Sequence, residues 1–202
     1  MISYAIKEGV NGTPKIPGDK SISHRSIIIP SISNGICEIN NILKSEDVIH
    51  TLNAFKSMGV QIEENQNKIT VYGRGLNSLK ESKNSIYLGN SGTSARLLTG
   101  LLSSQSFRSV LTGDESLSKR PMKRISDPLS NMNAKIETTN GSLPLIIRAS
   151  KLNPCEINLQ IPSAQIKSGL LLASLNIKGE TKIIENSITR DHTEIMLDSF
   201  GA

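Results

Sequence analysis

The residues best suited to chemistry are small polar residues and cations at the expected start of a helix. Lys20, Ser21 and Arg25 follow Gly18 and Asp19. Free backbone amides at a helix start, together with hydroxyl and cationic side chains, bind small anions such as phosphates and carboxylates. Asp19 separates the glycine from the lysine, which excludes a Walker loop for nucleoside triphosphates. Taken alone, the segment is also typical of a capped helix with solvated cations.

Two further segments carry the same kinds of residue. Residues 90–93 lie between an expected strand and an expected helix, where Gly92 permits close approach of the backbone and Arg96 follows one turn later. Residues 119–124 hold four cations around Pro121, and guanidinium groups pair with both oxygens of a carboxylate or phosphate. Each segment by itself is equally typical of a solvated helix face.

The last two segments belong to the C-terminal third of the chain. Ser163 and Gln165, with Lys167, open an expected helix, and residues 187–192, which include Arg190, precede the final one. All these segments lie at helix starts in successive repeats, and equivalent ends of repeated units lie on one side of a domain. We therefore expect several anion-binding helix ends to converge.

An internal repeat positions these segments. The order strand, helix, strand, helix and hairpin recurs, and its second helices end at intervals of roughly 70 residues, at positions 58–59, 132–133 and 200–201. The pattern predicts an α/β (α+β) fold of repeated βαβαββ units, over about residues 15–78, 79–150 and 151–202. The third copy lacks its closing hairpin, which would leave a sheet edge uncovered. We expect a fragment with a truncated third unit; the alternative is a natural chain that ends in a short helix.

Hydrophobic periodicity and turn residues place the individual elements. Helices are expected from residue 21, and over 45–58, 91–103, 122–132, 163–175 and 192–200. Strands are expected over 36–39, 60–63, 68–72, 86–88, 109–111, 156–159 and 182–184, with a further strand-like stretch at 3–7. Pro30 predicts a kink or an early end of the first helix. Asn133 replaces a helix-ending glycine, and residues 140–141 predict a hairpin turn.

The composition favours a small anionic partner over nucleic acid. The 202 residues carry a formal net charge of +5, but aromatics make up only 3% and Trp is absent, which leaves few platforms for stacking bases. Cys37 and Cys155 lie far apart, which fits a reducing compartment. The three histidines lack paired spacing, so we assign no metal. Because the N-terminus lacks a leader pattern and no stretch reaches the ~20 apolar residues of a membrane span, we expect a soluble cytoplasmic protein.

Four motifs resemble the EPSP synthase (3-phosphoshikimate 1-carboxyvinyltransferase) family. They are PGDKSISHR (17–25), LGNSGTSAR (88–96), LTGD (111–114) with RPM (120–122), and SITRDHTE (187–194). The resemblance covers nearly the whole chain, and the motifs are specific in length and order. The sister family, UDP-N-acetylglucosamine enolpyruvyl transferase, is the alternative. That family typically has Lys-Asn where this chain has Lys20 and Ser21, and it has a reactive cysteine in the loop that here holds Arg120.

The resemblance implies transfer of the enolpyruvyl group of phosphoenolpyruvate to the 5-hydroxyl of shikimate 3-phosphate, without a metal or organic cofactor. It implies one domain of a two-domain fold with the active site between the domains, in a protein that is a monomer at full length. Residues 1–14 would then be an orphan strand of the other, missing domain, and residues 15–202 the domain of three repeats.

The resemblance also implies roles for individual residues. Shikimate 3-phosphate would be held by Lys20, Ser21, Arg25, Ser163, Gln165, Ser187 and Arg190. Phosphoenolpyruvate would be held by Lys20, Gly92, Arg120 and Gln165. Lys20, which would reach both substrates, is the candidate catalytic residue. The family's acid and base carboxylates lie in the missing half, so we assign no such role to Asp47, Asp114 or Asp191 and expect binding without turnover. The competing hypothesis from another class is a non-catalytic module that binds anions or nucleic acid.

Overall fold

Three helices begin at equally spaced capping residues in the computed structural model, which describes residues 11–14, 16–66 and 68–202. They are α1 (Lys20–Ile32), α3 (Gly92–Ser103) and α6 (Ala164–Ser174). Their capping residues Asp19, Ser91 and Ser163 each accept a hydrogen bond from a backbone N–H three residues further on, at 2.8, 3.2 and 3.4 Å. Such caps satisfy amides that have no partner inside the helix. The three helix starts expected from the sequence are therefore confirmed.

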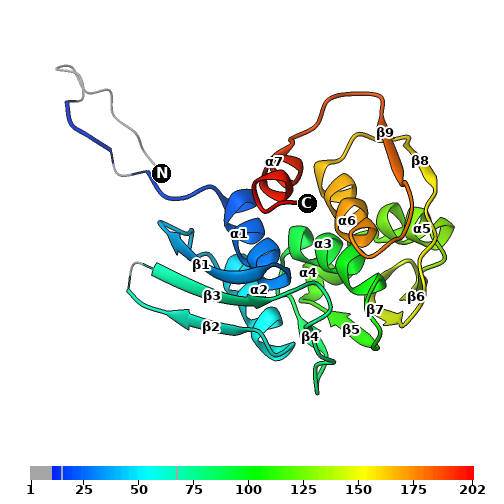
Figure 1. Ribbon diagram of the computed structural model, residues 1–202, viewed down its shortest axis with the longest axis horizontal. Coiled ribbons are helices and arrows are strands. Elements are labelled where there is room, and N and C mark those ends of the chain that lie inside the picture. The colour runs from blue at the N-terminus through cyan, green and yellow to red at the C-terminus, as the bar shows by residue number, and fades with distance from the viewer. Residues whose placement is uncertain (1–10, 15, 67) are drawn as a thin grey trace.

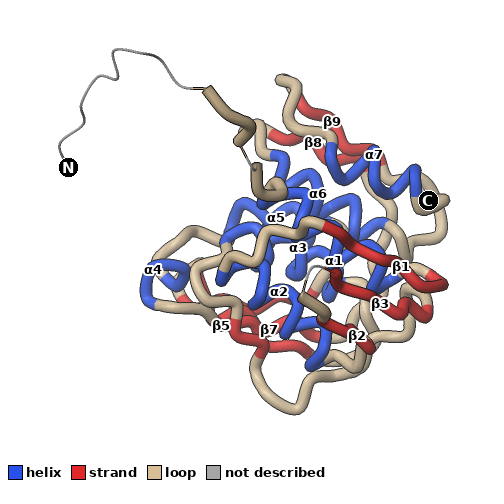
Figure 2. The backbone as a smooth tube through the Cα atoms, turned by 90° about the vertical axis from the view of Figure 1, so that its left-hand side faces the viewer, coloured by secondary structure: helices blue, strands red, loops and turns tan. Residues whose placement is uncertain are grey.

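A second set of helices packs around the first. It consists of α2 (Glu46–Ser57), α5 (Lys123–Asn131) and α7 (His192–Ser199). Each contacts the first helix of its own repeat or of a neighbouring one. The short helix α4 (Glu115–Ser118), capped by Asp114, was not expected from the sequence. Figure 1 shows α1, α3 and α6 at the centre of the molecule with strands around them, and Figure 2 shows the same arrangement from the side.

The strand pairing repeats along the chain. The first sheet has the order β1-β3-β2 and the second β4-β5-β7-β6, while β8 pairs in parallel with β9. The strands are β1 (Asn34–Asn40), β2 (Gln61–Glu64), β3 (Lys68–Arg74), β4 (Ile86–Tyr87), β5 (Ser109–Thr112), β6 (Lys135–Thr139), β7 (Ser142–Arg148), β8 (Glu156–Leu159) and β9 (Lys182–Glu185). The antiparallel order β1-β3-β2 matches β5-β7-β6, and the parallel pair β4-β5 matches β8-β9. The expected repeated α/β architecture is confirmed. The strand-like stretch at 3–7 lies outside the described residues.

The core is centred on α3, whose contact with α6 is unusually close. A Cβ on Gly100 would lie 1.9 Å from the carbonyl oxygen of Gly169, so the two backbones touch at this point. Leu97, Leu98 and Leu101 on α3 are fully buried. Because the two helices meet backbone to backbone, their first turns are held in a fixed relation at one end of the domain.

Local expectations at three special positions can be compared with the structure. Pro30 lies inside α1, and the helix continues through it to Ile32. A Cβ on Gly73 would lie 2.1 Å from the carbonyl oxygen of Pro30, so β3 packs directly on this helix end. Asn133 adopts a positive φ of 72°, and Asn140 begins the β6–β7 turn with a φ of 52°, as the sequence predicts.

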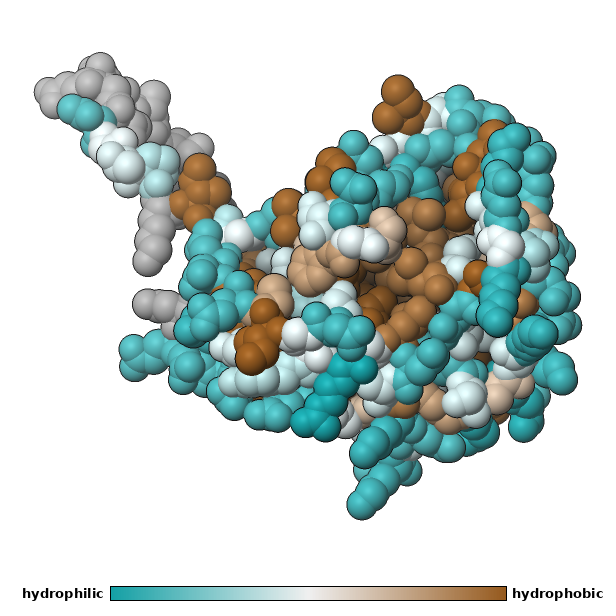
Figure 3. Space-filling view, viewed as in Figure 1, coloured by the Kyte–Doolittle hydropathy of each residue, from teal (hydrophilic) through white to brown (hydrophobic). Residues whose placement is uncertain are grey.

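The apolar surface of the third repeat is open on one face. Figure 3 shows apolar side chains gathered over α6, in the hollow between α7 and β9. Within the described part of the chain, β9 has one strand neighbour, whereas its counterpart β5 has two. No helix among the described residues is long and apolar enough to cross a membrane.

Candidate anion-binding site

The first turns of α1, α3 and α6 border one polar cavity of about 440 Å³. It is lined by Lys20, Asp47, Asn90, Gly92, Thr93, Arg120 and Gln165. Four of these are residues that the sequence singled out: Lys20, Gly92, Arg120 and Gln165. They come from all three repeats, so the expected convergence of helix starts is found in the folded chain.

Two guanidinium groups approach each other across Gly92. A Cβ on Gly92 would lie 2.8 Å from Nη1 of both Arg96 and Arg120. Burial lowers the pKa of Arg96, and the neighbouring charges of Arg120 and Arg124 lower it further. An anion placed between these cations would relieve their mutual repulsion, because its charge is attracted by both. The absence of a side chain at Gly92 is what allows both guanidinium groups to lie this close to the start of α3.

Gln165 is held in place by donors and acceptors on α3. Its Oε1 accepts a hydrogen bond of 3.1 Å from Arg96 Nη1, and its Nε2 donates one of 3.1 Å to Thr93 Oγ1. Arg96 Nη1 also donates to the carbonyl oxygen of Gly92 at 3.0 Å. The amide therefore has a fixed orientation at the wall of the cavity.

Lys20 and Arg120 are each paired with an oxygen on the cavity wall. Lys20 Nζ forms an ion pair with Asp47 Oδ2, and Arg120 Nη2 donates to Asn90 Oδ1. The side chain of Lys20 is 53% exposed, so its ammonium is accessible to a ligand. An incoming anion would compete with these wall oxygens for the same donors.

The remaining expected residues form a neighbouring cluster or lie apart. Arg190 Nη1 donates to Ser21 Oγ at 3.4 Å. Ser163 is occupied as the cap of α6, and Ser187 is exposed on the segment between β9 and α7. The structure thus brings Ser21 and Arg190 together, but it places Ser187 away from the described cavity wall.

Arg25 points into the protein. It is 3% exposed, and its guanidinium donates to Thr193 Oγ1 at 2.6 Å, to Ser168 Oγ at 2.6 Å and to the carbonyl oxygen of Ser21 at 3.0 Å. Burial lowers its pKa, while the charge of Glu194 opposes that effect. Arg25 therefore joins α1 to α6 and α7 and fixes the backbone of Ser21.

Buried hydroxyl groups connect the helices behind the cavity. Nδ1 of His24 lies 2.8 Å from Thr51 Oγ1 and 3.3 Å from Ser94 Oγ, and Ser94 Oγ lies 2.6 Å from Ser91 Oγ, the cap of α3. His24 is fully buried, and its burial lowers its pKa to about 4. The imidazole is therefore neutral at neutral pH and links α1, α2 and α3.

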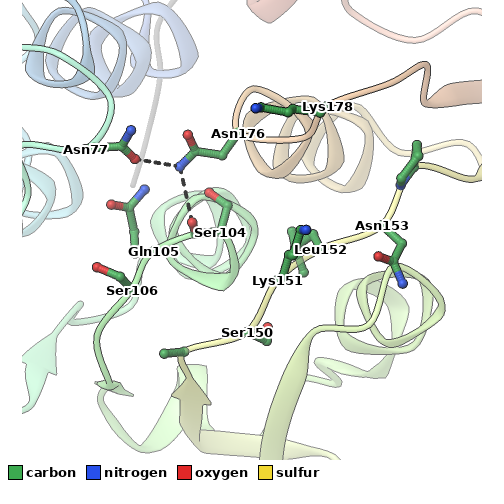
Figure 4. A pocket seen from close by; sticks show the side chains of 12 residues that line it. Asn77, Ser104, Gln105, Ser106, Ser150, Lys151, Leu152, Asn153, Asn176 and Lys178 are labelled. Atoms are coloured by element: carbon green, nitrogen blue, oxygen red, sulfur yellow. Dashed lines mark hydrogen bonds between the residues drawn. The ribbon is translucent and has the colours of Figure 1, made fainter.

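A larger cavity of about 850 Å³ lies at the opposite ends of α3 and α6. Figure 4 shows Asn176 donating to Asn77 Oδ1 at 3.0 Å and to the carbonyl oxygen of Ser104 at 3.1 Å, where α3 ends. Helix C-termini carry partial negative charge and exposed carbonyl oxygens, which disfavour anions. The smaller cavity at the N-terminal ends is the better anion site despite its size.

The comparisons with known proteins identify the family of the chain. A family model described as EPSP synthase (3-phosphoshikimate 1-carboxyvinyltransferase) matches residues 5–202. The chain belongs to the EPSP synthase family. It is 52% identical to the 3-phosphoshikimate 1-carboxyvinyltransferase of Ruthia magnifica subsp. Calyptogena magnifica, over 100% of this chain and 47% of that protein. For the enzyme of the same name from Leuconostoc citreum, the identity is 47%, over 99% of this chain and 47% of the relative.

The solved structures of EPSP synthases show the same fold. EPSP synthase from Acinetobacter baumannii matches with a TM-score of 0.91 and 49% sequence identity, over 94% of this chain and 44% of that chain. The chain therefore spans about half the length of the curated relatives it matches.

Several residues at this cavity were not among the assigned site residues. Asp47, Asn90 and Thr93 line the cavity, and Arg96 orients Gln165. The last three lie in the segment around Gly92 that the sequence marked, so their position could have been inferred. Asp47 carried no signal beyond its place in the first turn of α2.

Lys167 differs from its expected place among the anion-binding cations. Its side chain is only 9% exposed and is fully engaged by two glutamates, Glu185 and Glu194.

Within the described ranges, 11–14, 16–66 and 68–202, no group of three or more His, Cys, Asp or Glu residues is arranged to hold a metal ion.

Proposed function

We propose that the complete protein transfers the enolpyruvyl group of phosphoenolpyruvate to the 5-hydroxyl of shikimate 3-phosphate and releases phosphate. The observation that carries this proposal is the cavity at which Lys20, Gly92, Arg120 and Gln165 converge from three repeats. Membership of the EPSP synthase family supports the choice of reaction. The relatives named 3-phosphoshikimate 1-carboxyvinyltransferase support the choice of substrates.

Two multiply charged anions must come together for this reaction. Coulomb repulsion between them is large in a site partly shielded from water, and fixed cations with oriented amides offset it. In the proposal, the site for shikimate 3-phosphate is formed by Lys20, Ser21, Arg25, Ser163, Gln165, Ser187 and Arg190, with Arg25 acting through the backbone of Ser21. Phosphoenolpyruvate is bound by Lys20, Gly92, Arg120 and Gln165. Lys20 serves both substrates and is the proposed catalytic residue of this chain.

The geometry gives the proposed residues different tasks. Lys20 and Arg120 supply accessible charge, whereas Arg25 donates to Thr193, Ser168 and the backbone of Ser21. Arg25 therefore acts on shikimate 3-phosphate mainly by fixing Ser21. Arg190, which donates to Ser21, and Ser187 on the same segment are proposed to contact the phosphate of shikimate 3-phosphate.

The bond changes balance without an additional reagent. The 5-hydroxyl gives up its proton to a base as its oxygen adds to C2 of phosphoenolpyruvate, and C3 gains a proton from an acid, which gives a tetrahedral intermediate. The C2–O bond to phosphate then breaks, and a proton leaves C3 to restore the double bond. We propose that the acid and base for these steps lie outside residues 15–202, and that no metal or organic cofactor takes part.

The same proposal sets the organisation of the protein. Residues 15–202 form one domain of three repeats, at about 15–78, 79–150 and 151–202, and residues 1–14 contribute a strand to the second domain. The complete protein acts as a cytoplasmic monomer on small-molecule substrates, without nucleic acid or membrane partners. The low content of aromatic residues supports the exclusion of nucleic acid.

Titration calorimetry on the 202-residue chain tests the proposal. Shikimate 3-phosphate is expected to bind saturably, and Lys20→Ala is expected to weaken binding by about tenfold or more, because a charge-assisted contact is lost. UDP-N-acetylglucosamine serves as the control ligand of the sister family, and single-stranded DNA as that of a nucleic-acid module. A folded chain that ignores shikimate 3-phosphate but binds the DNA with a steep salt dependence contradicts the proposal.

A further inference from the structure

A buried lysine bridges the two ends of the segment that carries Ser187 and Arg190. Lys167 Nζ lies 2.8 Å from Glu185 Oε1 and 2.6 Å from Glu194 Oε1. Glu185 is the last residue of β9, and Glu194 lies in the first turn of α7. One ammonium group therefore joins the residues on either side of segment 186–191.

The middle of segment 186–191 is tied to the same cluster. Thr189 donates to the two carboxylate oxygens of Glu185, from its backbone N–H at 3.3 Å and from its hydroxyl at 2.7 Å. Glu185 thus receives Lys167 and Thr189 at once, so the path of the segment depends on the direction of this carboxylate. Arg190 follows directly and reaches Ser21 Oγ.

The charges in the cluster favour this arrangement. Burial lowers the pKa of Lys167, but the hydrogen bonds to Glu185 and Glu194 outweigh burial and raise it overall. The hydrogen bonds from Lys167 and then Thr189 lower the pKa of Glu185. Lys167 and Glu185 are therefore both charged at neutral pH, as a buried ion pair requires.

The docking of α7 has separate support. Thr193 accepts a hydrogen bond from Arg25 Nε at 2.6 Å and donates one of 2.7 Å to Ser168 Oγ, and all three side chains are buried. These contacts hold the start of α7 against α1 and α6 without Lys167. Loss of Lys167 should therefore loosen segment 186–191 while α7 stays in place.

We propose that Lys167 is a positioning residue that, through Glu185 and Glu194, holds segment 186–191 where Ser187 and Arg190 meet the phosphate of shikimate 3-phosphate. The identity of the ligand rests on the proposed function, whereas the effect on the segment does not. Lys167 itself does not touch the ligand, because both glutamates and the packing of α6 enclose its ammonium.

The test compares Lys167→Met with Lys167→Arg, and with Lys178→Met as a control at an exposed lysine. Hydrogen–deuterium exchange is measured without ligand in peptides from segment 186–191 and from α7. We expect Lys167→Met to speed exchange in the segment by about tenfold, with little change in α7, because the bonds to Glu185 lose their support. Lys167→Arg should restore slow exchange, and Lys178→Met should match the wild type.

Calorimetry with shikimate 3-phosphate supplies the second readout. Lys167→Met should weaken binding by about tenfold, and Lys167→Arg should recover most of it. Unchanged exchange in the segment overturns the proposal, and so does faster exchange with binding within twofold of the wild type. Failure of the wild-type chain to bind shikimate 3-phosphate contradicts the proposed function instead. In that case, hydrogen–deuterium exchange without ligand still tests whether Lys167 holds the segment. If Lys167→Met does not fold, Glu185→Gln replaces it with the same expected results.

Discussion

The two ends of α3 and α6 offer opposite environments to a ligand. At the N-terminal ends, a cavity of about 440 Å³ brings Lys20 and Arg120 beside Gly92. At the C-terminal ends, the larger cavity of about 850 Å³ presents the carbonyl oxygen of Ser104 and the amide of Asn176. The larger space is therefore the poorer anion site. The direction of the helices, which decides where amides and carbonyls are exposed, matters more than volume.

The largest expected effect is a difference in kcat/KM between substitutions of a lysine at the smaller cavity and of a lysine at the larger cavity. In the complete protein, Lys20→Ala should lower kcat/KM by roughly 1,000-fold or more, because its ammonium faces both anions in the transition state. Lys178→Ala, at the larger cavity, should leave kcat/KM within about twofold of the wild-type value. Steady-state kinetics with both substrates measures the two values.

The contrast between the two cavities fails if both lysine variants lose activity to a similar extent. Near-normal turnover by Lys20→Ala would also remove the proposed role of that residue. Circular dichroism of both variants shows whether either change has unfolded the protein.

The next effect concerns the backbone contact between α3 and α6, which fixes the two helices relative to each other. Gly100→Ala should lower the free energy of unfolding by about 1–3 kcal/mol, because its Cβ would lie 1.9 Å from the backbone oxygen of Gly169. Urea denaturation measures the change. Ser174→Ala on α6, which removes only a bond to its own helix, should stay within about 0.5 kcal/mol. Equal stability of the two variants would mean that the helices can separate easily.

The third expected effect is a pH dependence of stability, and it arises from His24 behind the cavity at the N-terminal ends of the helices. The pKa of His24 is about 4 in the folded chain, against an ordinary value of 6.5. Between these values the unfolded chain binds a proton that the folded chain does not, so acid favours unfolding. The free energy of unfolding should fall by about 1.5 kcal/mol from pH 6.5 to pH 5, and less in His24→Asn. Urea titrations of the two proteins at both pH values measure this change. An equal fall in the free energy of unfolding for the two proteins contradicts the prediction.

The smallest effect tests whether neighbouring cations in one charge run are equivalent. Lys119 is 73% exposed and forms an ion pair with Glu115, whereas Arg120 lines the cavity. Lys119→Ala should change shikimate 3-phosphate and phosphoenolpyruvate binding by less than about twofold. Arg120→Ala should weaken phosphoenolpyruvate binding by about tenfold or more. Equal losses in calorimetry would indicate a diffuse basic surface instead of a defined site.

Most elements could be predicted because their signals are local. Capping residues such as Ser91 and turn residues such as Asn140 act on the next few residues of the chain, and each appears where the sequence placed it. Helix α4 was missed because four residues carry too little periodicity to mark a helix. The part of the cavity wall around Gly92 could be predicted from the sequence. Asp47 could not, because it pairs with Lys20 only after α2 has packed against α1.

The sequence alone determined the repeated α/β architecture and the helix starts that border the cavity, because caps, glycines and hydrophobic periodicity are properties of short segments. The tertiary structure decided which cations face the cavity. Lys20 and Arg120 lie on its wall, while Arg25 and Lys167 turn inward to polar groups on α6, α7 and β9. All four are ordinary basic residues in the sequence. Their roles differ because partners distant along the chain compensate the burial of two of them, and only folding brings those partners near.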